Sequence, residues 1–427
     1  MRAKRLLVII CAVGILASCS STTSSSQSSS SSSGASPGAS SSGSAPSADP
    51  AMAASIDKLM QDNMAKRHLK AAIVRVTIDG KDVLTKAYGE SMSGVPATTD
   101  MHFRNGAIVL SYLSTLLLKL VDQGKVSLDD KASKWVPEIA HSDEVTLGQL
   151  AQMTSGYADY VLGNPDANTL LYTDPYRQWT SEEVLALKTP EPLLYTPGTN
   201  WNYSHTNYWV LGLALEKATG KTMADLLHDD VLAPLGLNDT NDNGSTPNIP
   251  EPALHAFTSE RRQFLGVPDG TRLYEDATFW NPSWTILGGA VETTDIHDLA
   301  ETAAGIGSGK LLSAGSYAQL ISTDLRGKTT ALPACPATCF PQSDKYSYGL
   351  GIISTGDWLI QDPLFAGEAS AFAFLPSKKV AIAVVTTFAE KAFAADGSYV
   401  PETSSNAANR VWRDIAAIAA PTDAPPA

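Results

Sequence analysis

Apolar side chains recur at helical spacing in one segment near the first quarter of the chain. The segment runs from about Ala107 to Gln123 and is followed by Gly124, a residue that commonly ends helices. The apolar positions that follow this spacing are Ile108, Tyr112, Leu113, Leu116, Leu117, Leu120 and Val121. Because they cover most of the circumference of a helix, the pattern predicts a helix that is largely buried.

Strand patterns occur on both sides of this helix, near the two ends of the chain. Residues 71–78 and 83–88 are rich in apolar and β-branched side chains and flank Asp79-Gly80, which is a strong short-range signal for a β-hairpin. Three later segments are also predicted as strands: residues 348–353, 371–375 and 380–385.

The remaining segments are predicted to be helices and loops. Residues 145–236 are mainly helical in pattern, and Thr180 with Glu183 forms the sequence signature of a capping box. Residues 238–284 have few periodic apolar positions, as expected of loops that wall a cleft. A last helix is predicted over residues 406–419. The fold class predicted is α+β: an antiparallel sheet flanked by terminal helices, with a large inserted helical region.

The N-terminus has the pattern of an export signal over residues 1–18. Basic residues precede an apolar run from Leu6 to Leu16, which is too short to cross a membrane as a permanent helix. The sequence Leu16-Ala17-Ser18-Cys19 resembles the bacterial lipobox, and this resemblance implies cleavage before Cys19 and attachment of diacylglycerol to its sulfur. An ordinary secretory signal followed by a chance cysteine is the alternative.

Residues 19–50 form the predicted lipidated cysteine and its tether. They are nearly all Ser, Gly, Ala, Thr and Pro, a composition that buries no core and behaves as a flexible linker. We therefore expect one folded domain, residues 51–420, held at the extracytoplasmic face of the cell membrane by the lipid on Cys19.

Charge and cysteine content narrow the classes of partner. Removal of the predicted signal takes away three of the 31 basic residues and leaves all 44 acidic residues. A chain this acidic is not expected to bind nucleic acid.

Once Cys11 has left with the signal and Cys19 carries lipid, Cys335 and Cys339 remain and are expected to form a disulfide. A metal site is the alternative for this pair, but no His or second Cys pair lies nearby in the sequence, so neither a metal nor another cofactor is expected.

The sequence around the central helix resembles a known family of enzymes. Phe103-Arg104, Gly106 and the run from Leu120 to Asp129 are similar to the active-site segment of class C serine β-lactamases and D-alanyl-D-alanine carboxypeptidases, which are penicillin-binding proteins. In that family the Phe-Arg-x-Gly phrase leads into a catalytic Ser-x-x-Lys. Here Ala107 stands at the serine position and Leu110 at the lysine position.

The loss of these two groups has a direct chemical consequence. A Ser and a Lys three residues apart share one face of a helix, so that the amine can take the hydroxyl proton. Ala107 has no oxygen to attack with, and Leu110 accepts no proton. Loss of the nucleophile alone costs on the order of 10⁶ in turnover in hydrolases of this type. Ser111 is a neighbouring hydroxyl, but its position on the helix is geometrically poor for a replacement.

Two further motifs of the resemblance are also altered. The segment Tyr203-Ser204-His205 resembles the family's Tyr-Ser-Asn, where the Tyr shuttles protons with the Lys and the Asn binds the amide of the substrate. Tyr203 is kept, and His205 takes the place of the Asn. The family's third motif, a cation and a Gly on a strand at the site, corresponds to Gln361-Asp362-Pro363, where Gln361 has no charge and Pro363 replaces the Gly.

Three hypotheses for function follow from the resemblance. The first is a membrane-anchored pseudoenzyme whose cleft binds a peptidoglycan stem peptide or an envelope protein without an acyl-enzyme step. The second is an active hydrolase with a relocated nucleophile, either Ser111 or Tyr203 paired with His205. The third is a purely structural envelope protein whose cleft is filled by side chains.

Overall fold

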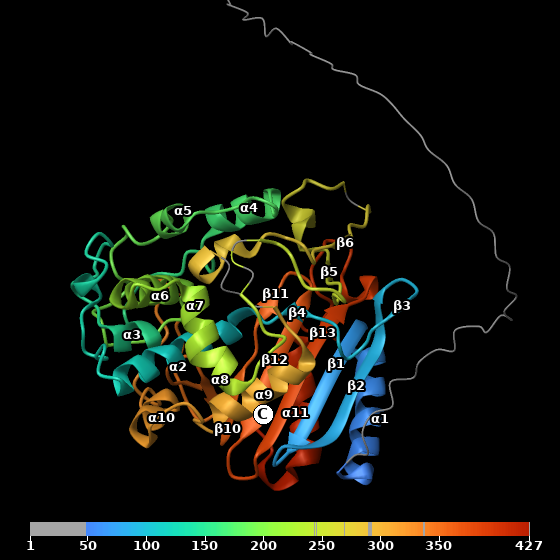
Figure 1. Ribbon diagram of the computed structural model, residues 1–427. Helices are drawn as coiled ribbons and strands as arrows, with labels where there is room; N and C mark the ends of the chain where they lie inside the picture. The colour runs from blue at the N-terminus through green and yellow to red at the C-terminus, as the bar shows by residue number, and fades with distance from the viewer. Residues whose placement is uncertain are drawn as a thin grey trace, which may run out of the picture. The chain divides into compact units, whose positions relative to one another are not determined.

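The core of the structure is an antiparallel sheet made from the two ends of the chain. In this computed structural model, residues 48–242, 244, 246–268, 270–288, 293–335 and 338–426 are described. The strand order is β3-β2-β1-β13-β12-β10-β9-β8, and β11 pairs with β12 (Figure 1). The predicted signal peptide, Cys19 and nearly all of the tether lie outside the described residues.

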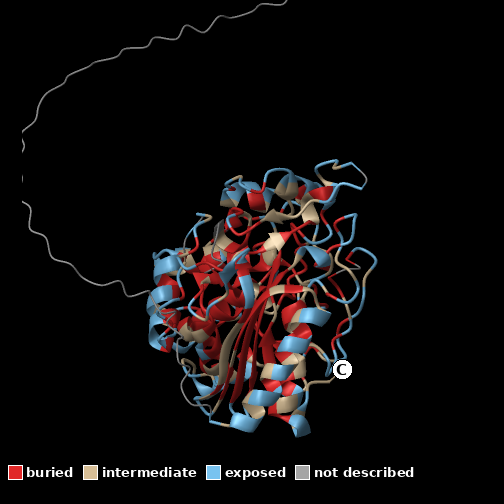
Figure 2. Cartoon of the chain, turned by 90° about the vertical axis from the view of Figure 1, so that its right-hand side faces the viewer, coloured by how far each residue is buried: buried red, intermediate tan, exposed pale blue. Residues whose placement is uncertain are grey.

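The strands of this sheet differ widely in length. Their bounds are β1 Leu69–Ile78, β2 Lys81–Met92, β3 Val95–Pro96, β8 Ser347–Tyr348, β9 Ile353–Thr355, β10 Trp358–Gln361, β11 Leu364–Phe365, β12 Glu368–Leu375 and β13 Val380–Phe388. Every residue of β12 and β13 is buried, so the centre of the sheet is covered on both faces. Figure 2 shows this buried centre between helices whose outer faces are exposed. Two short ladders lie outside the main sheet: β4 Phe103–Arg104 with β7 Thr293–Thr294, and β5 Phe257–Thr258 with β6 Glu275–Asp276.

The predicted hairpin is confirmed. β1 and β2 pair antiparallel, and Ile78 lies opposite Lys81. Asp79 and Gly80 have φ angles of 49° and 73°. A two-residue turn with both φ values positive matches the twist of the strands, which is why Asp-Gly favours it.

Helices from both ends of the chain pack on the sheet. α1 (Pro50–Lys66) contacts β1 and β2, and α11 (Ala407–Ala419) contacts β12 and β13. The predicted last helix is confirmed, and the Asn406 side chain accepts a hydrogen bond from the Asn409 backbone N–H at its start. α9 (Ile296–Gly307) also packs on β12 and β13.

The inserted region is helical, as predicted. Its helices are α2 Val109–Asp122, α3 Leu147–Ala151, α4 Pro165–Thr173, α5 Ser181–Ala186, α6 His205–Thr219, α7 Met223–Leu227, α8 Ala233–Leu235 and α10 Ala314–Leu320. Thr180 and Glu183 form the predicted capping box at the start of α5. The α+β class with an antiparallel sheet is therefore confirmed.

Two predicted elements differ in detail from the structure. The strand predicted over residues 348–353 is broken into β8 and β9. A Cβ atom at Gly349 would lie 2.1 Å from the Leu320 carbonyl oxygen, and one at Gly351 would lie 2.2 Å from that of Leu110. The chain therefore leaves the sheet here to pack closely against α10 and α2.

The second difference is at the start of the central helix. The first turn is a 3-10 turn, η1 (Gly106–Ile108), before α2 begins.

Among the described residues, no helix is long and apolar enough to cross a membrane.

Candidate functional site

A cavity of about 310 Å³ opens where the start of α2 meets the edge of the sheet. Its wall comes from η1, the loop before α6 with the first residue of that helix, the 3-10 turn η5 (Pro282–Trp284) with the two residues after it, and the β10–β11 connection. The lining residues are Gly106, Ala107, Leu162, Tyr203, His205, Trp284, Thr285, Ile286, Tyr346, Ile353, Gln361, Asp362, Pro363, Leu364 and Phe365. We call this space the first cavity. Five of the six predicted site positions line it, and Leu110 does not.

The helix start and the sheet edge touch at the floor of the first cavity. Ala107 is partly exposed in η1. Gly106 has a φ angle of 59°, and a Cβ atom placed on it would lie 2.7 Å from Pro363 Cβ. Pro363 therefore fills the space beside the helix start. In the family that the sequence resembles, a glycine at this position would let a substrate backbone lie close to the strand.

The side chains one turn further along α2 face the core. Leu110 is fully buried. Ser111 is also fully buried, and its hydroxyl donates to the Ile108 carbonyl oxygen at 2.7 Å. The Ser114 and Tyr208 hydroxyls lie 2.8 Å apart in the same core. Ser111 is thus not placed to attack a ligand in the first cavity.

Tyr203 lies on the loop that precedes α6. Its backbone N–H donates to the Thr338 carbonyl oxygen at 3.0 Å, next to the disulfide that joins Cys335 and Cys339. Burial raises the pKa of the Tyr203 phenol well above its ordinary value, and the negative charges of Asp159 and Asp362 raise it further. The phenol therefore stays protonated at neutral pH.

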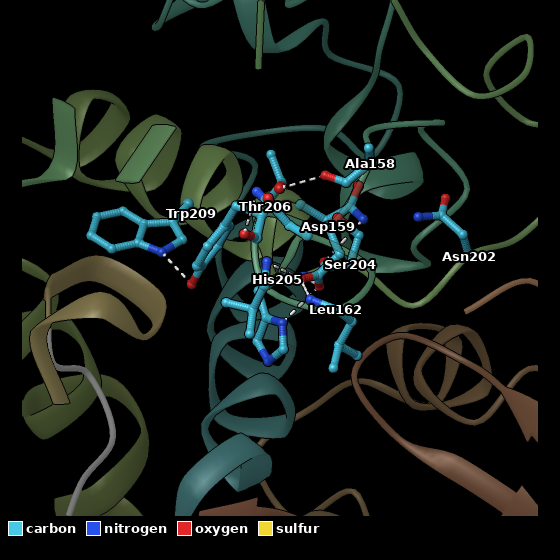
Figure 3. Close-up of polar contacts among 12 residues, drawn as sticks. Ala158, Asp159, Leu162, Asn202, Ser204, His205, Thr206 and Trp209 are labelled. Atoms are coloured by element: carbon cyan, nitrogen blue, oxygen red, sulfur yellow. Dashed lines mark hydrogen bonds and ion pairs between the residues drawn. The ribbon is translucent and has the colours of Figure 1, made fainter. Parts of the chain in front are cut away.

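His205, the first residue of α6, is held by a buried aspartate. The Asp159 carboxylate lies 2.7 Å from His205 Nδ1 and accepts the His205 backbone N–H at 2.7 Å (Figure 3). It also accepts the backbone N–H groups of Val161 and Leu162 at 2.6 and 2.7 Å. Burial raises the pKa of Asp159, but the charge of His205 and these hydrogen bonds outweigh it and lower the pKa below the ordinary value.

This contact fixes the orientation of the imidazole ring. With Nδ1 against Asp159, Nε2 has no hydrogen-bond partner within the described part of the chain, and the ring lines the first cavity. The Tyr203 and His205 rings are nearly perpendicular, with centroids 5.2 Å apart. Asp159 was not predicted from the sequence, because it lies in a loop without periodicity and its partner is far along the chain.

The described residues at the sheet edge place no lysine or arginine in the lining of the first cavity. The Gln361 side chain donates from Nε2 to the Gly351 carbonyl oxygen at 2.7 Å. Burial raises the pKa of the Asp362 carboxyl to about 7, although the charge of Arg413 opposes this. That carboxyl also accepts a hydrogen bond from the Asn409 side chain. No lysine or arginine is found among the described residues that line the cavity, so a ligand carboxylate would lack a counter-charge there. In the described ranges, no group of three His, Cys, Asp or Glu side chains is placed to hold a metal ion.

A helix start, a tyrosine loop and the edge of an antiparallel sheet that meet around one cleft are the framework of the β-lactamase-like serine hydrolases. The chain belongs to the Beta-lactamase family, whose family model matches residues 56–402.

The relatives of the chain include an esterase and a penicillin-binding protein. Esterase EstB of Burkholderia gladioli is 30% identical over 201 residues, which are 44% of this chain and 51% of the esterase. Penicillin-binding protein 4 of Amycolatopsis lactamdurans is 31% identical over 199 residues, which are 44% of this chain and 47% of that protein. The chain thus spans about half the length of the curated relatives it matches.

Solved structures support the same fold. D-amino acid amidase from Ochrobactrum anthropi SV3 has a TM-score of 0.68 at 18% identity, over 86% of this chain and 99% of the amidase. A D-stereospecific amidohydrolase from Streptomyces has a TM-score of 0.65 at 23% identity, over 79% of this chain and 94% of that enzyme. At these identities the likeness concerns the fold alone.

Proposed function

We propose that this chain is a non-hydrolytic member of the Beta-lactamase family that binds a ligand in the first cavity without forming an acyl-enzyme. The observation that carries the proposal is Ala107, which stands at the serine position of the family motif and lines the cavity with a methyl group. No serine, cysteine or lysine occurs among the described residues that line it. Covalent catalysis needs a nucleophile and an adjacent base, and the motif supplies neither.

The ligand class that we propose is a peptidoglycan stem peptide, presented at the cell envelope where the predicted lipid on Cys19 would hold the protein. No lysine or arginine occurs among the described residues that line the first cavity, and the charge of His205 is paired with Asp159. The peptide would therefore enter through its uncharged amide groups rather than through a free terminal carboxylate. The partly exposed Tyr203 and His205 side chains supply polar contacts for such amides. An envelope protein that presents a neutral segment to the same cavity is the other candidate ligand.

A titration tests this proposal. An N-acylated D-alanyl-D-alanine peptide with an amidated terminus should bind more tightly than the same peptide with a free carboxylate, as measured by calorimetry. Ala107→Trp should abolish binding by filling the cavity. Ala304→Trp, at a partly exposed alanine that lines a different cavity on α9, should bind as the parent does. Steady hydrolysis of the peptide, lost in Ala107→Trp, would contradict a purely binding role.

A hydrolase remains the second candidate function, because His205 and Asp159 have the geometry of an oriented imidazole base. This candidate requires a nucleophile. The two hydroxyl groups that line the first cavity are poorly suited to this role. The Thr285 hydroxyl already donates to the Pro282 carbonyl oxygen, and the raised pKa of the Tyr203 phenol keeps that group protonated. A water activated by His205 would give turnover that His205→Gln removes.

The purely structural hypothesis is disfavoured, since side chains leave the first cavity open.

A further inference from the structure

A second cavity, of about 410 Å³, lies directly beside the first. Five residues line both spaces: Leu162, His205, Trp284, Leu364 and Phe365. We call this the second cavity. Because one set of side chains faces both spaces, the two cavities are neighbouring compartments of the same cleft, with His205 at their junction.

Apart from His205, the residues that wall the second cavity belong to none of the three family motifs. α4 contributes Leu171 and Tyr172, and it contacts η4 (Glu260–Gln263), which is followed by Phe264. The Tyr172 and Phe264 rings are stacked with centroids 4.8 Å apart. The Trp284 and Phe365 rings are also stacked, with centroids 5.9 Å apart. Both of these residues line the first cavity as well. The walls are therefore flat aromatic surfaces fixed by one another, which suits an apolar occupant.

Charged groups that could recognise an ion are scarce in the second cavity. Of the described lining residues, only His205 and Glu260 have side chains that commonly carry charge. Both Glu260 oxygens already accept hydrogen bonds, at 3.0 Å from the Tyr172 hydroxyl and at 2.9 Å from the Tyr399 hydroxyl. Nδ1 of His205 is engaged by Asp159. Because the Glu260 oxygens are engaged and the charge of His205 is paired with Asp159, we expect an uncharged occupant in this space.

Two large apolar side chains that line the cleft are strongly exposed. Leu162 and Leu364, which line both cavities, are 44% and 45% exposed. A concentration of exposed apolar surface beside a cavity is typical of an entry for an apolar ligand.

We propose that the second cavity binds an uncharged apolar chain, an acyl or aryl group, that is part of a ligand whose polar end lies beside Tyr203 and His205 in the first cavity. The inference rests on the proposed function, because it takes the first cavity as a binding site. It adds an apolar group to the proposed ligand: a neutral amphiphile such as a peptide amide that carries an acyl or aryl substituent, rather than a bare peptide.

The test uses the neutral fluorescent probe N-phenyl-1-naphthylamine and the chain from Ser20 onward, which keeps the whole compact unit of residues 44–427. The probe should bind with enhanced fluorescence and accept energy from the cavity tryptophans Trp280 and Trp284. Ala366, which is partly exposed and lines only the second cavity, offers a site to fill it. Ala366→Phe should weaken probe binding at least tenfold, whereas the matched control Ala304→Phe should not change it.

A displacement series then identifies the chain class. Straight-chain primary amides of increasing length should displace the probe with a gain of about fourfold per added methylene until the cavity is full. The corresponding carboxylates should displace it at least tenfold less well. Equal probe binding by Ala366→Phe and the parent, or preferential displacement by the carboxylates, would overturn the inference. Neither result would bear on acylation, whereas turnover or a covalent adduct at the first cavity would contradict the proposed function alone.

Discussion

At the scale of single residues, the proposal that the site forms no acyl-enzyme rests on Ala107 and Leu110. Leu110 is fully buried in the core and Ala107 lines the first cavity. Placing a lysine at Leu110 puts an amine among apolar side chains, which costs several kcal/mol or forces the amine to be neutral. A neutral amine beside a serine is nonetheless what acylation requires.

We therefore expect Ala107→Ser with Leu110→Lys to melt at a lower temperature than the parent and to be acylated slowly by a β-lactam. Ala107→Ser alone should not be acylated. Mass spectrometry and thermal melting of both variants check this expectation. If the single variant is acylated as fast as the double variant, Leu110 does not occupy the lysine position.

The contact between Gly106 and Pro363 gives a second prediction at this scale. Gly106→Ala places a methyl group 2.7 Å from Pro363 Cβ and puts alanine at a φ angle of 59°. The left-handed conformation costs about 1–2 kcal/mol, and the steric overlap adds to it. In a double-mutant cycle by chemical denaturation, Pro363→Gly should recover the overlap but not the conformational cost. Strict additivity of the two substitutions would show that these residues do not touch.

At the scale of elements, the sequence pattern was sufficient to predict the helices and strands whose signals are local in the sequence. The β1–β2 hairpin, α2, α11 and the strands β12 and β13 all follow periodicity or turn chemistry that is local in the sequence. The break between β8 and β9 does not, because it depends on the approach of α10 and α2 to Gly349 and Gly351.

The same distinction holds for the site. The motif positions Ala107, Tyr203 and Pro363 could be found from local phrases, and the structure brings them to one cavity. Asp159 and the second cavity could not, since each is created by segments that are distant in the sequence and carry no periodic signal. The pairing of an aspartate with His205 becomes visible only in three dimensions.

A buried carboxyl at the start of β12 makes stability depend on pH. Burial raises the pKa of Glu368 from its ordinary 4.5 to about 8, although Arg104 opposes this with its charge and a backbone hydrogen bond. Between these two values the folded protein binds more protons than the unfolded chain, so the free energy of unfolding falls as pH rises from about 4.5 to about 8. The loss is on the order of several kcal/mol and is absent below this window.

Urea denaturation of the parent and of Glu368→Gln between pH 5 and pH 8 checks this prediction. The variant should lose less stability than the parent over that range, and the loss that remains should end near pH 7, because burial raises the pKa of Asp362 to about 7. Glu182→Gln, at an exposed carboxyl on α5, is the matched control and should behave as the parent. An unchanged slope in Glu368→Gln would mean that Glu368 is ionised in the folded protein at acidic pH.

At the scale of the whole molecule, the N-terminal sequence predicts where the folded domain works. Cys19→Ala should release the protein from the membrane fraction, because the predicted lipid attaches to that sulfur. Globomycin should cause an uncleaved precursor to accumulate. Fractionation followed by immunoblotting measures both effects. A Cys19→Ala protein that still sediments with membranes after a salt wash would place the anchor elsewhere.

The central claim is that a chain of the Beta-lactamase family has kept the cleft without the acyl-enzyme reaction. The most direct measurement is the intact mass of the chain from Ser20 onward after exposure to benzylpenicillin and, separately, to a fluorophosphonate. Since Ala107 offers no oxygen and Ser111 is buried, we predict an unchanged mass with both reagents. A stable adduct mapped to any residue that lines the first cavity would contradict the claim and identify a relocated nucleophile.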